Sequence, residues 1–232
     1  MVQNLETETP SQIIYPESDG QPMADNTLQF RWIVKIKENL DILFAEVEDV
    51  FVAGDLLWYP VEGSNNISQA PDIMVVFGRQ KGERGSYLQW LEDNISPQVV
   101  FEILSPSNTQ KEMAKKFEFY RKYGVEEYYL FDPRKIEFCG WMRSEGELTV
   151  IDAIENWVSP RLNIRFELTA ETLEIYYPDG KRFLTPVELA KRAEEAEKRA
   201  EEERQRAELA EARIKILEER LREAGIDPEQ LQ

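Results

Sequence analysis

VVFEILSPSNTQKEMAKKFEFYRKYGVEEYYLFDP occupies residues 99–133. The apolar run over residues 98–104 predicts a buried strand. Residues 109–123 follow as a lysine-rich helix, which ends at Gly124, a residue typical of helix C-termini. Residues 127–131 are again apolar and predict another strand. This part of the chain therefore forms a strand, a helix and a strand in succession.

The preceding residues extend this unit towards the N-terminus. Asn26 or Thr27 is suited to cap a helix, and the apolar residues behind it have helical spacing. Residues 49–59 are strand-like around Gly54, residues 60–70 are a loop rich in Gly, Ser and Asn, and residues 73–77 predict a strand. The predicted order is helix, three strands, helix and strand. The apolar positions of the first helix are Ile33, Ile36, Leu40, Leu43 and Phe44.

Further short strands are expected after residue 133, and they would extend or flank the sheet. A turn at residues 178–180 leads into another extended segment at residues 182–184. The expected strands cover residues 136–141, 148–151, 162–166 and 173–177.

The C-terminal segment has a different composition, dominated by Ala, Glu, Arg and Lys. Thr185, Pro186 and Glu188 form a helix-capping signal, and Gly225 closes the helix. A seam with alternating spacings of four and three residues predicts a coiled coil and a homodimer, whose helices run either parallel or antiparallel. The alternative is a lone helix held by pairs such as Glu195–Arg199 and Glu202–Arg206. The seam comprises Leu189, Ala193, Ala196, Ala200, Glu203, Ala207, Ala210, Ile214, Leu217, Leu221 and Ala224.

We therefore divide the chain into an N-terminal arm over residues 1–24, a domain over residues 25–185, and a coiled-coil helix with a short tail over residues 186–232. Apolar runs too short to span a membrane and the lack of an apolar leader predict a cytoplasmic protein with no membrane partner.

The composition restricts the chemistry. The 232 residues include no histidine and one cysteine, Cys139. Ser-His-Asp triads, Cys-His pairs, HExxH sites and histidine- or cysteine-rich zinc sites are therefore excluded. Carboxylates, lysine, tyrosine, hydroxyls and metal-bound water remain, which favours a hard cation on oxygen ligands.

The net charge of −17 argues against a protein that coats nucleic acid generally. Basic residues do cluster in two places where a phosphate backbone could bind. These are Arg79, Lys81 and Arg84 in the loop after residue 77, and Lys111, Lys115, Lys116, Arg121 and Lys122 on the helix that follows residue 108.

Two carboxylates occur where strands should be buried. Asp72 opens one strand and Glu102 lies within another, and such groups are costly unless they are paired or bind a metal. If the strands pair, both carboxylates could bind one Mg²⁺, with the carbonyl oxygen of Ile103 as a further ligand. Lys116, whose neighbours Phe117 and Tyr120 face the core, is our candidate for orienting a metal-bound water. Lys115 is its rival.

These residues resemble the Uma-two family of endonucleases, which belongs to the PD-(D/E)XK, or restriction-endonuclease-like, superfamily. The similarity covers about residues 15 to 185. It implies an α/β fold with a restriction-endonuclease-like α-β-β-β-α-β core and a mixed sheet, extended here by extra strands and the C-terminal coiled-coil helix. It also implies Mg²⁺-dependent DNA cleavage, with Mn²⁺ as the other suitable cation. The matching segments are Pro71-Asp72, Glu102-Ile103-Leu104-Ser105-Pro106-Ser107, Lys116 with Phe119-Tyr120, Gly124-Val125-Glu126-Glu127-Tyr128 and Asp132-Pro133.

The chain departs from the superfamily motif at Leu104, which occupies the usual lysine position, so the resemblance assigns that role to Lys116. An additional acidic ligand could come from Glu17, Asp19 or Glu38. The expected function is a metal-dependent endodeoxyribonuclease that uses Asp72, Glu102 and Lys116. The alternative is a non-catalytic scaffold with a nuclease fold that acts through its coiled coil.

Overall fold

In the computed structural model, residues 13–18, 20 and 23–225 are described. The chain divides into two compact units, Met1–Thr185 and Pro186–Gln232. The first unit has a central mixed sheet between helices, and the second is a long helix. The predicted α/β fold class is confirmed.

The sheet contains six strands in the order β1-β3-β5-β6-β7-β8. The pair β5 and β6 is parallel, and the other neighbours are antiparallel. The parallel pair arises because helix α2 connects the two strands. The strands are β1 (Val50–Gly54), β3 (Ile73–Phe77), β5 (Val99–Ile103), β6 (Glu127–Asp132), β7 (Glu137–Ser144) and β8 (Glu147–Val150).

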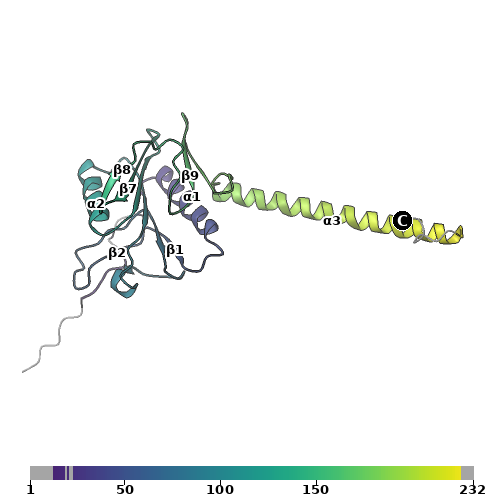
Figure 1. The fold of residues 1–232 in the computed structure, drawn as a ribbon, viewed down its shortest axis with the longest axis horizontal. Coiled ribbons are helices and arrows are strands. Elements are labelled where there is room, and N and C mark those ends of the chain that lie inside the picture. Colours follow the sequence, from purple (N-terminus) through teal and green to yellow (C-terminus); the bar gives the residue numbers. More distant parts are fainter. Residues whose placement is uncertain (1–12, 19, 21–22, 226–232) are drawn as a thin grey trace, which may run out of the picture. The chain divides into compact units, whose positions relative to one another are not determined.

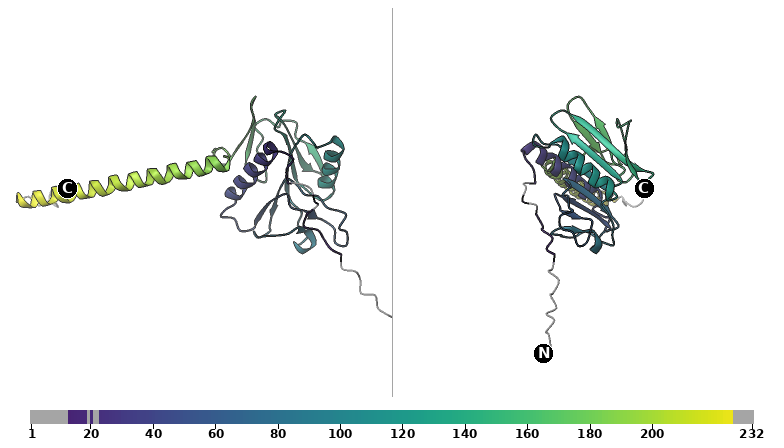
Figure 2. Two further views of the ribbon diagram at one scale, coloured as in Figure 1. Left: turned by 180° about the vertical axis from the view of Figure 1, so that it is seen from behind. Right: turned by 90° about the vertical axis from the view of Figure 1, so that its left-hand side faces the viewer.

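Helices α1 (Thr27–Leu43) and α2 (Gln110–Lys122) lie on opposite sides of this sheet, as Figure 1 and the left panel of Figure 2 both show. Asn26 caps α1 by accepting hydrogen bonds from the amides of Leu28 and Gln29, both at 3.0 Å. Thr109 and Glu112 form a capping box at the start of α2.

Alternate residues of the central strands face two separate cores. Ile73 and Phe101 belong to the core under α1, whereas Met74 and Val100 belong to the core under α2, together with Tyr120. This alternation follows from the two-residue period of a strand. A residue's position in the strand therefore determines which helix it faces.

Two small sheets accompany the main one. Strands β9 (Arg165–Leu168) and β10 (Leu173–Tyr176) pair in antiparallel fashion, and β2 (Trp58–Tyr59) pairs with β4 (Tyr87–Leu88) in parallel. The β2–β4 pair was not predicted, because two residues are too few to produce a periodic signal. A short 3₁₀ helix, η1 (Gln89–Leu91), follows β4.

Three predicted segments differ from the structure. The strand expected at residues 162–166 begins only at Arg165, because Asn163 has a left-handed φ of 54° within a turn. The segment at 182–184 forms a single bridge, Tyr176↔Arg182, rather than a strand. The run at residues 49–59 is interrupted at Asp55, which has a left-handed φ of 49°.

The second unit consists of α3 (Pro186–Glu223), none of whose described side chains is buried within the chain. No helix in the described part of the chain has the length and apolar character that a membrane span requires. The single cysteine, Cys139, lies exposed on β7.

Candidate active site

Asp72 and Glu102 lie on the same face of the sheet. The register of β3 and β5 pairs Ile73 with Phe101, so the next position outward places Asp72 opposite Glu102. Asp72 is two positions from Met74 and Glu102 is two positions from Val100, and both of those residues belong to the core under α2. Because side chains alternate along a strand, Asp72 and Glu102 face α2 as well. Both residues are nearly inaccessible, with exposed fractions of 8% for Asp72 and 2% for Glu102.

Glu102 is held by two donors from α2. Lys116 Nζ donates to Glu102 Oε2 at 2.7 Å, and the Tyr120 hydroxyl donates to Glu102 Oε1. Lys116 and Tyr120 are four residues apart, so they lie on the same face of the helix. The sequence indicated Tyr120 as a core residue, but its hydrogen bond to Glu102 depends on how α2 packs on the sheet.

The second carboxylate is bound by the backbone. Asp72 Oδ2 accepts a hydrogen bond from the Ile103 amide at 2.6 Å. Burial, and next the charge of Glu102, raise the pKa of Asp72 to about 8, although Lys116 acts in the opposite direction. The single positive charge of Lys116 therefore does not offset the burial and mutual repulsion of the two carboxyl groups of Asp72 and Glu102.

Lys116 remains a cation in this environment. Burial disfavours its charged form, but the nearby carboxylates of Glu102 and Asp72 outweigh burial and raise its pKa. Lys115, the rival candidate, is exposed and does not line the cavity.

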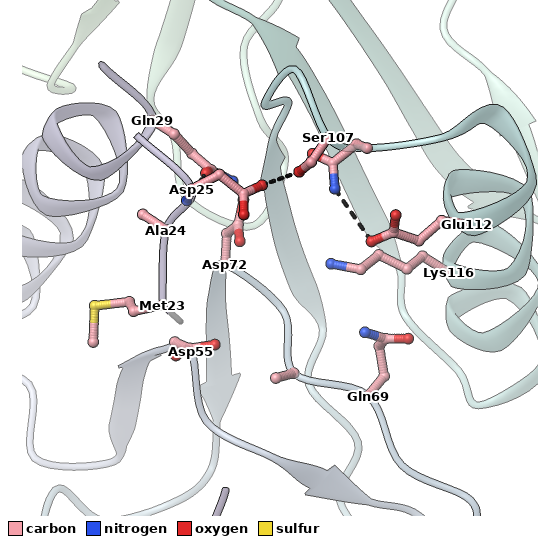
Figure 3. A pocket seen from close by; sticks show the side chains of 12 residues that line it. Met23, Ala24, Asp25, Gln29, Asp55, Gln69, Asp72, Ser107, Glu112 and Lys116 are labelled. Carbon is pink, nitrogen blue, oxygen red and sulfur yellow. Dashed lines mark hydrogen bonds between the residues drawn. The ribbon is translucent and has the colours of Figure 1, made fainter. Parts of the chain in front are cut away.

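A cavity of about 450 Å³ opens beside Asp72 and Lys116. Figure 3 shows Lys116 extending from α2 into this cavity, with Asp72 and Asp55 on the opposite side. Asp25 and Glu112 also contribute to the lining. The cavity therefore has four carboxyl groups around a single lysine.

The rim near α1 is fixed by polar contacts that the sequence did not predict. The hydroxyls of Ser105 and Ser107 both donate to Asp25 and lower its pKa, against the effect of burial. Gln29 Nε2 donates to the Ile103 carbonyl at 2.9 Å, and Gln29 Oε1 accepts from the Asp25 amide at 2.9 Å. These contacts connect the start of α1 to the end of β5.

Asp55 is the other acidic residue that sequence reasoning missed. It follows β1, and its amide donates to the Pro71 and Asp72 carbonyls at 3.1 and 3.2 Å. Gly54 pairs with Ile73, so antiparallel pairing of β1 and β3 brings Asp55 to Asp72. The antiparallel register was the signal that could have identified it.

The acidic residues considered from the sequence lie elsewhere. Glu38 forms an ion pair with Lys37 at 3.3 Å on α1. Glu17 lies against Gly85, where an added Cβ would overlap its carboxylate. Asp19 is outside the described residues. Among the described residues, the cavity lining includes Asp25 and Asp55 rather than Glu17 or Glu38.

The residues present fit a hard divalent cation. Asp72, Glu102 and the Ile103 carbonyl supply oxygen atoms, and a carboxylate oxygen that accepts one hydrogen bond has further acceptor capacity for a cation. Within the described ranges, no group of three or more His, Cys, Asp and Glu side chains is arranged to hold a metal. A cation would therefore be held by this pair, the backbone carbonyl and water.

In the loop where a phosphate backbone could bind, the basic side chains form internal contacts. Arg79 and Arg84 both pair with Glu92, at 2.9 and 2.6 Å. Lys81 donates to the carbonyls of Phe44 and Ala45. On α2, Arg121 pairs with Glu118 and Glu147, whereas Lys111 and Lys115 are exposed.

Comparison with known proteins identifies the family of this chain. The profile of the Uma2 (Uma-two) family, described as "Putative restriction endonuclease", matches residues 13–172. The chain belongs to the Uma2 family. The resemblance stated from the sequence is thereby confirmed. The Uma2 match covers both candidate carboxylates and α2.

A solved structure also resembles part of this chain. The structure is described as "a putative nuclease belonging to DUF820 from Anabaena variabilis", with 18% sequence identity and a TM-score of 0.43. The similarity covers 60% of this chain and 74% of that chain. No curated protein matches this Uma2 chain.

Proposed function

We propose that this Uma2 protein is a metal-dependent endonuclease that hydrolyses DNA phosphodiester bonds at the cavity beside Asp72. The observation that carries the proposal is the placement of Asp72 and Glu102 opposite one another on one sheet face, with Lys116 at Glu102. Paired carboxylates with an adjacent lysine suit phosphodiester hydrolysis. Family membership supports the same reaction class.

Each residue has a distinct role in this proposal. Asp72, Glu102 and the Ile103 carbonyl would hold Mg²⁺, with Mn²⁺ as the alternative. The bound cation would lower the pKa of a coordinated water and neutralise charge on the phosphate. Lys116 would orient the attacking water and offset the negative charge that develops on the phosphate.

Tyr120 would act through Glu102 rather than on the substrate. Its hydroxyl lies in the α2 core, where it is fully buried and donates to Glu102 Oε1. This bond leaves Glu102 less freedom to rotate, so its second oxygen stays directed towards Lys116. Tyr120 is therefore a positioning residue.

The acidic lining gives the scaffold alternative a specific basis. Asp25, Asp55, Asp72 and Glu112 surround the cavity, whereas Lys116 is the one basic residue in its described lining. Such a cavity repels a polyanion unless cations bind first. The proposed enzyme must therefore bind divalent cations before it can accept DNA there.

The test combines cation binding with DNA cleavage. Calorimetric titration with Mg²⁺ or Mn²⁺ should show binding, and supercoiled plasmid should be nicked only when the cation is present. Asp72→Asn and Glu102→Gln should abolish nicking, whereas Glu118→Gln, on the exposed side of α2, should retain it. A folded wild-type protein that neither binds cations nor cleaves DNA would establish the scaffold alternative.

A further inference from the structure

Helix α3 presents an apolar stripe that the described chain leaves uncovered. Ile214 and Leu217 are 54% and 52% exposed, and Leu221 is half-buried. All three belong to the seam with spacings of four and three residues that begins at Leu189. A stripe with this period fits a second helix of the same kind, wound into a left-handed coiled coil.

The residues beside the seam carry a regular charge pattern. In heptad positions a to g, with Leu189 at d, every g position from the first heptad to the last is arginine. The g positions are Arg192, Arg199, Arg206, Arg213 and Arg220, and the e positions from the second heptad onward are Glu197, Arg204, Glu211 and Glu218.

This pattern distinguishes the two helix directions. In a parallel in-register dimer, each g residue faces the e residue five positions later on the other helix. Three of the four resulting contacts pair arginine with glutamate: 192 with 197, 206 with 211, and 213 with 218. In an antiparallel dimer, g faces g and e faces e, so arginine would meet arginine along the helix.

The intrahelical contacts agree with this assignment. Arg204, the exception at e, is held within its own helix by Glu201 at 2.7 Å, with Glu208 at 3.9 Å. By contrast, no ion pair is found for the five g arginines within the described range of α3, and the lone-helix pairs Glu195–Arg199 and Glu202–Arg206 do not form there. The g arginines are therefore available to a partner helix.

We propose that α3 binds a second copy of this chain as a parallel, in-register two-stranded coiled coil. Association is strongest at Ile214, Leu217 and Leu221, because the seam before them is mostly alanine and buries little surface. The Arg–Glu contacts set the direction. Each dimer then contains two copies of the cavity beside Asp72.

Oligomeric state and charge pairing test the first part of the proposal. The full-length chain should sediment as a dimer, and Arg206→Glu with Arg213→Glu should weaken association by about tenfold or more, because the new glutamates face Glu211 and Glu218. A matched control, Lys198→Glu with Lys215→Glu, makes the same charge change outside positions e and g and should remain dimeric. A wild-type monomer, trimer or tetramer would overturn the proposal.

Cross-linking tests the direction. In a Cys139→Ser background, Ala196→Cys at a seam position should form a disulfide-linked dimer on mild oxidation, because residue 196 meets its own copy in a parallel pair. Lys198→Cys, on the outer face, should cross-link far less. If Ala196→Cys cross-links only when mixed with an Ile214→Cys chain, the helices are antiparallel and the parallel assignment is wrong, because position d faces position a in an antiparallel pair.

Discussion

Lys116 on α2 donates to Glu102 on β5 across 2.7 Å, and the two side chains are only 12% and 3% exposed. A buried ion pair adds little net stability, but loss of one partner leaves the other charge uncompensated. Glu102 therefore depends on α2 for both its neutralising charge and its orientation.

Replacing Lys116 by methionine should lower the free energy of unfolding by about 3–5 kcal/mol, because the buried Glu102 loses its ammonium partner. Urea denaturation in the presence of a chelator measures this change. Lys115→Met is the matched control, since Lys115 is the adjacent but exposed lysine, and it should be nearly neutral. Equal stability of the two variants would show that the pair has no such role.

Asp72→Asn should stabilise the cation-free protein at high pH. The raised pKa of about 8 means that folded Asp72 keeps a proton that the unfolded chain releases above 3.8. The free energy of unfolding therefore falls as pH rises from about 4 to about 8. Asparagine removes this dependence, so relative to wild type the variant should gain nothing near pH 4 and up to about 1.4 kcal/mol for each pH unit between 4 and 8.

Thermal unfolding at pH 4, 6 and 8 with a chelator checks the Asp72 prediction. Asp152→Asn, at an exposed position, should follow the wild-type curve. A difference between wild type and Asp72→Asn that stays constant with pH would contradict the assigned pKa.

Tyr120→Phe should weaken cation binding by about tenfold, because Glu102 loses the hydroxyl that orients it. The buried ring is retained, so the protein should remain folded. Calorimetric titration with Mn²⁺ measures the effect. Tyr128→Phe is the control, since its ring packs 5.2 Å from that of Tyr120, and it should bind the cation normally. Similar losses in both variants would point to altered packing instead.

Glu203→Leu should strengthen the dimer. In a parallel pair, Glu203 would face its own copy at a buried seam position, where two like charges repel. Leucine removes the repulsion and adds apolar burial, so the dimer dissociation constant should fall by about tenfold or more. Sedimentation at several concentrations measures it, with Glu202→Leu on the outer face as the control. An unchanged constant would show that Glu203 lies outside the contact.

The central strands and both helices of the first unit were predictable because their signals are local. Residues 73–77 form an apolar run between polar segments, and Asn26 and Thr109 are good helix caps. The short strand β4 could not be predicted in this way, since the contact with β2 rather than its own two residues defines it.

The residues of the candidate site also differ in whether a local sequence signal identifies them. Asp72 and Glu102 are recognisable because each interrupts an apolar run, which makes a carboxylate conspicuous. Asp25, Gln29 and Asp55 are ordinary polar residues in the sequence. They reach the cavity because α1 packs against β5, and because β1 pairs with β3. Such information is tertiary and is absent from the local pattern.

The exposed thiol of Cys139 on β7 offers a direct measure of how the two N-terminal units of the proposed dimer are arranged. Each chain carries one cysteine, so a fully labelled dimer would carry two probes, one on each domain. Partial burial and the charge of Glu137 raise the pKa of this thiol, so labelling should proceed faster in mildly alkaline buffer. The separation between two spin labels would then tell whether both cavities can reach one DNA duplex.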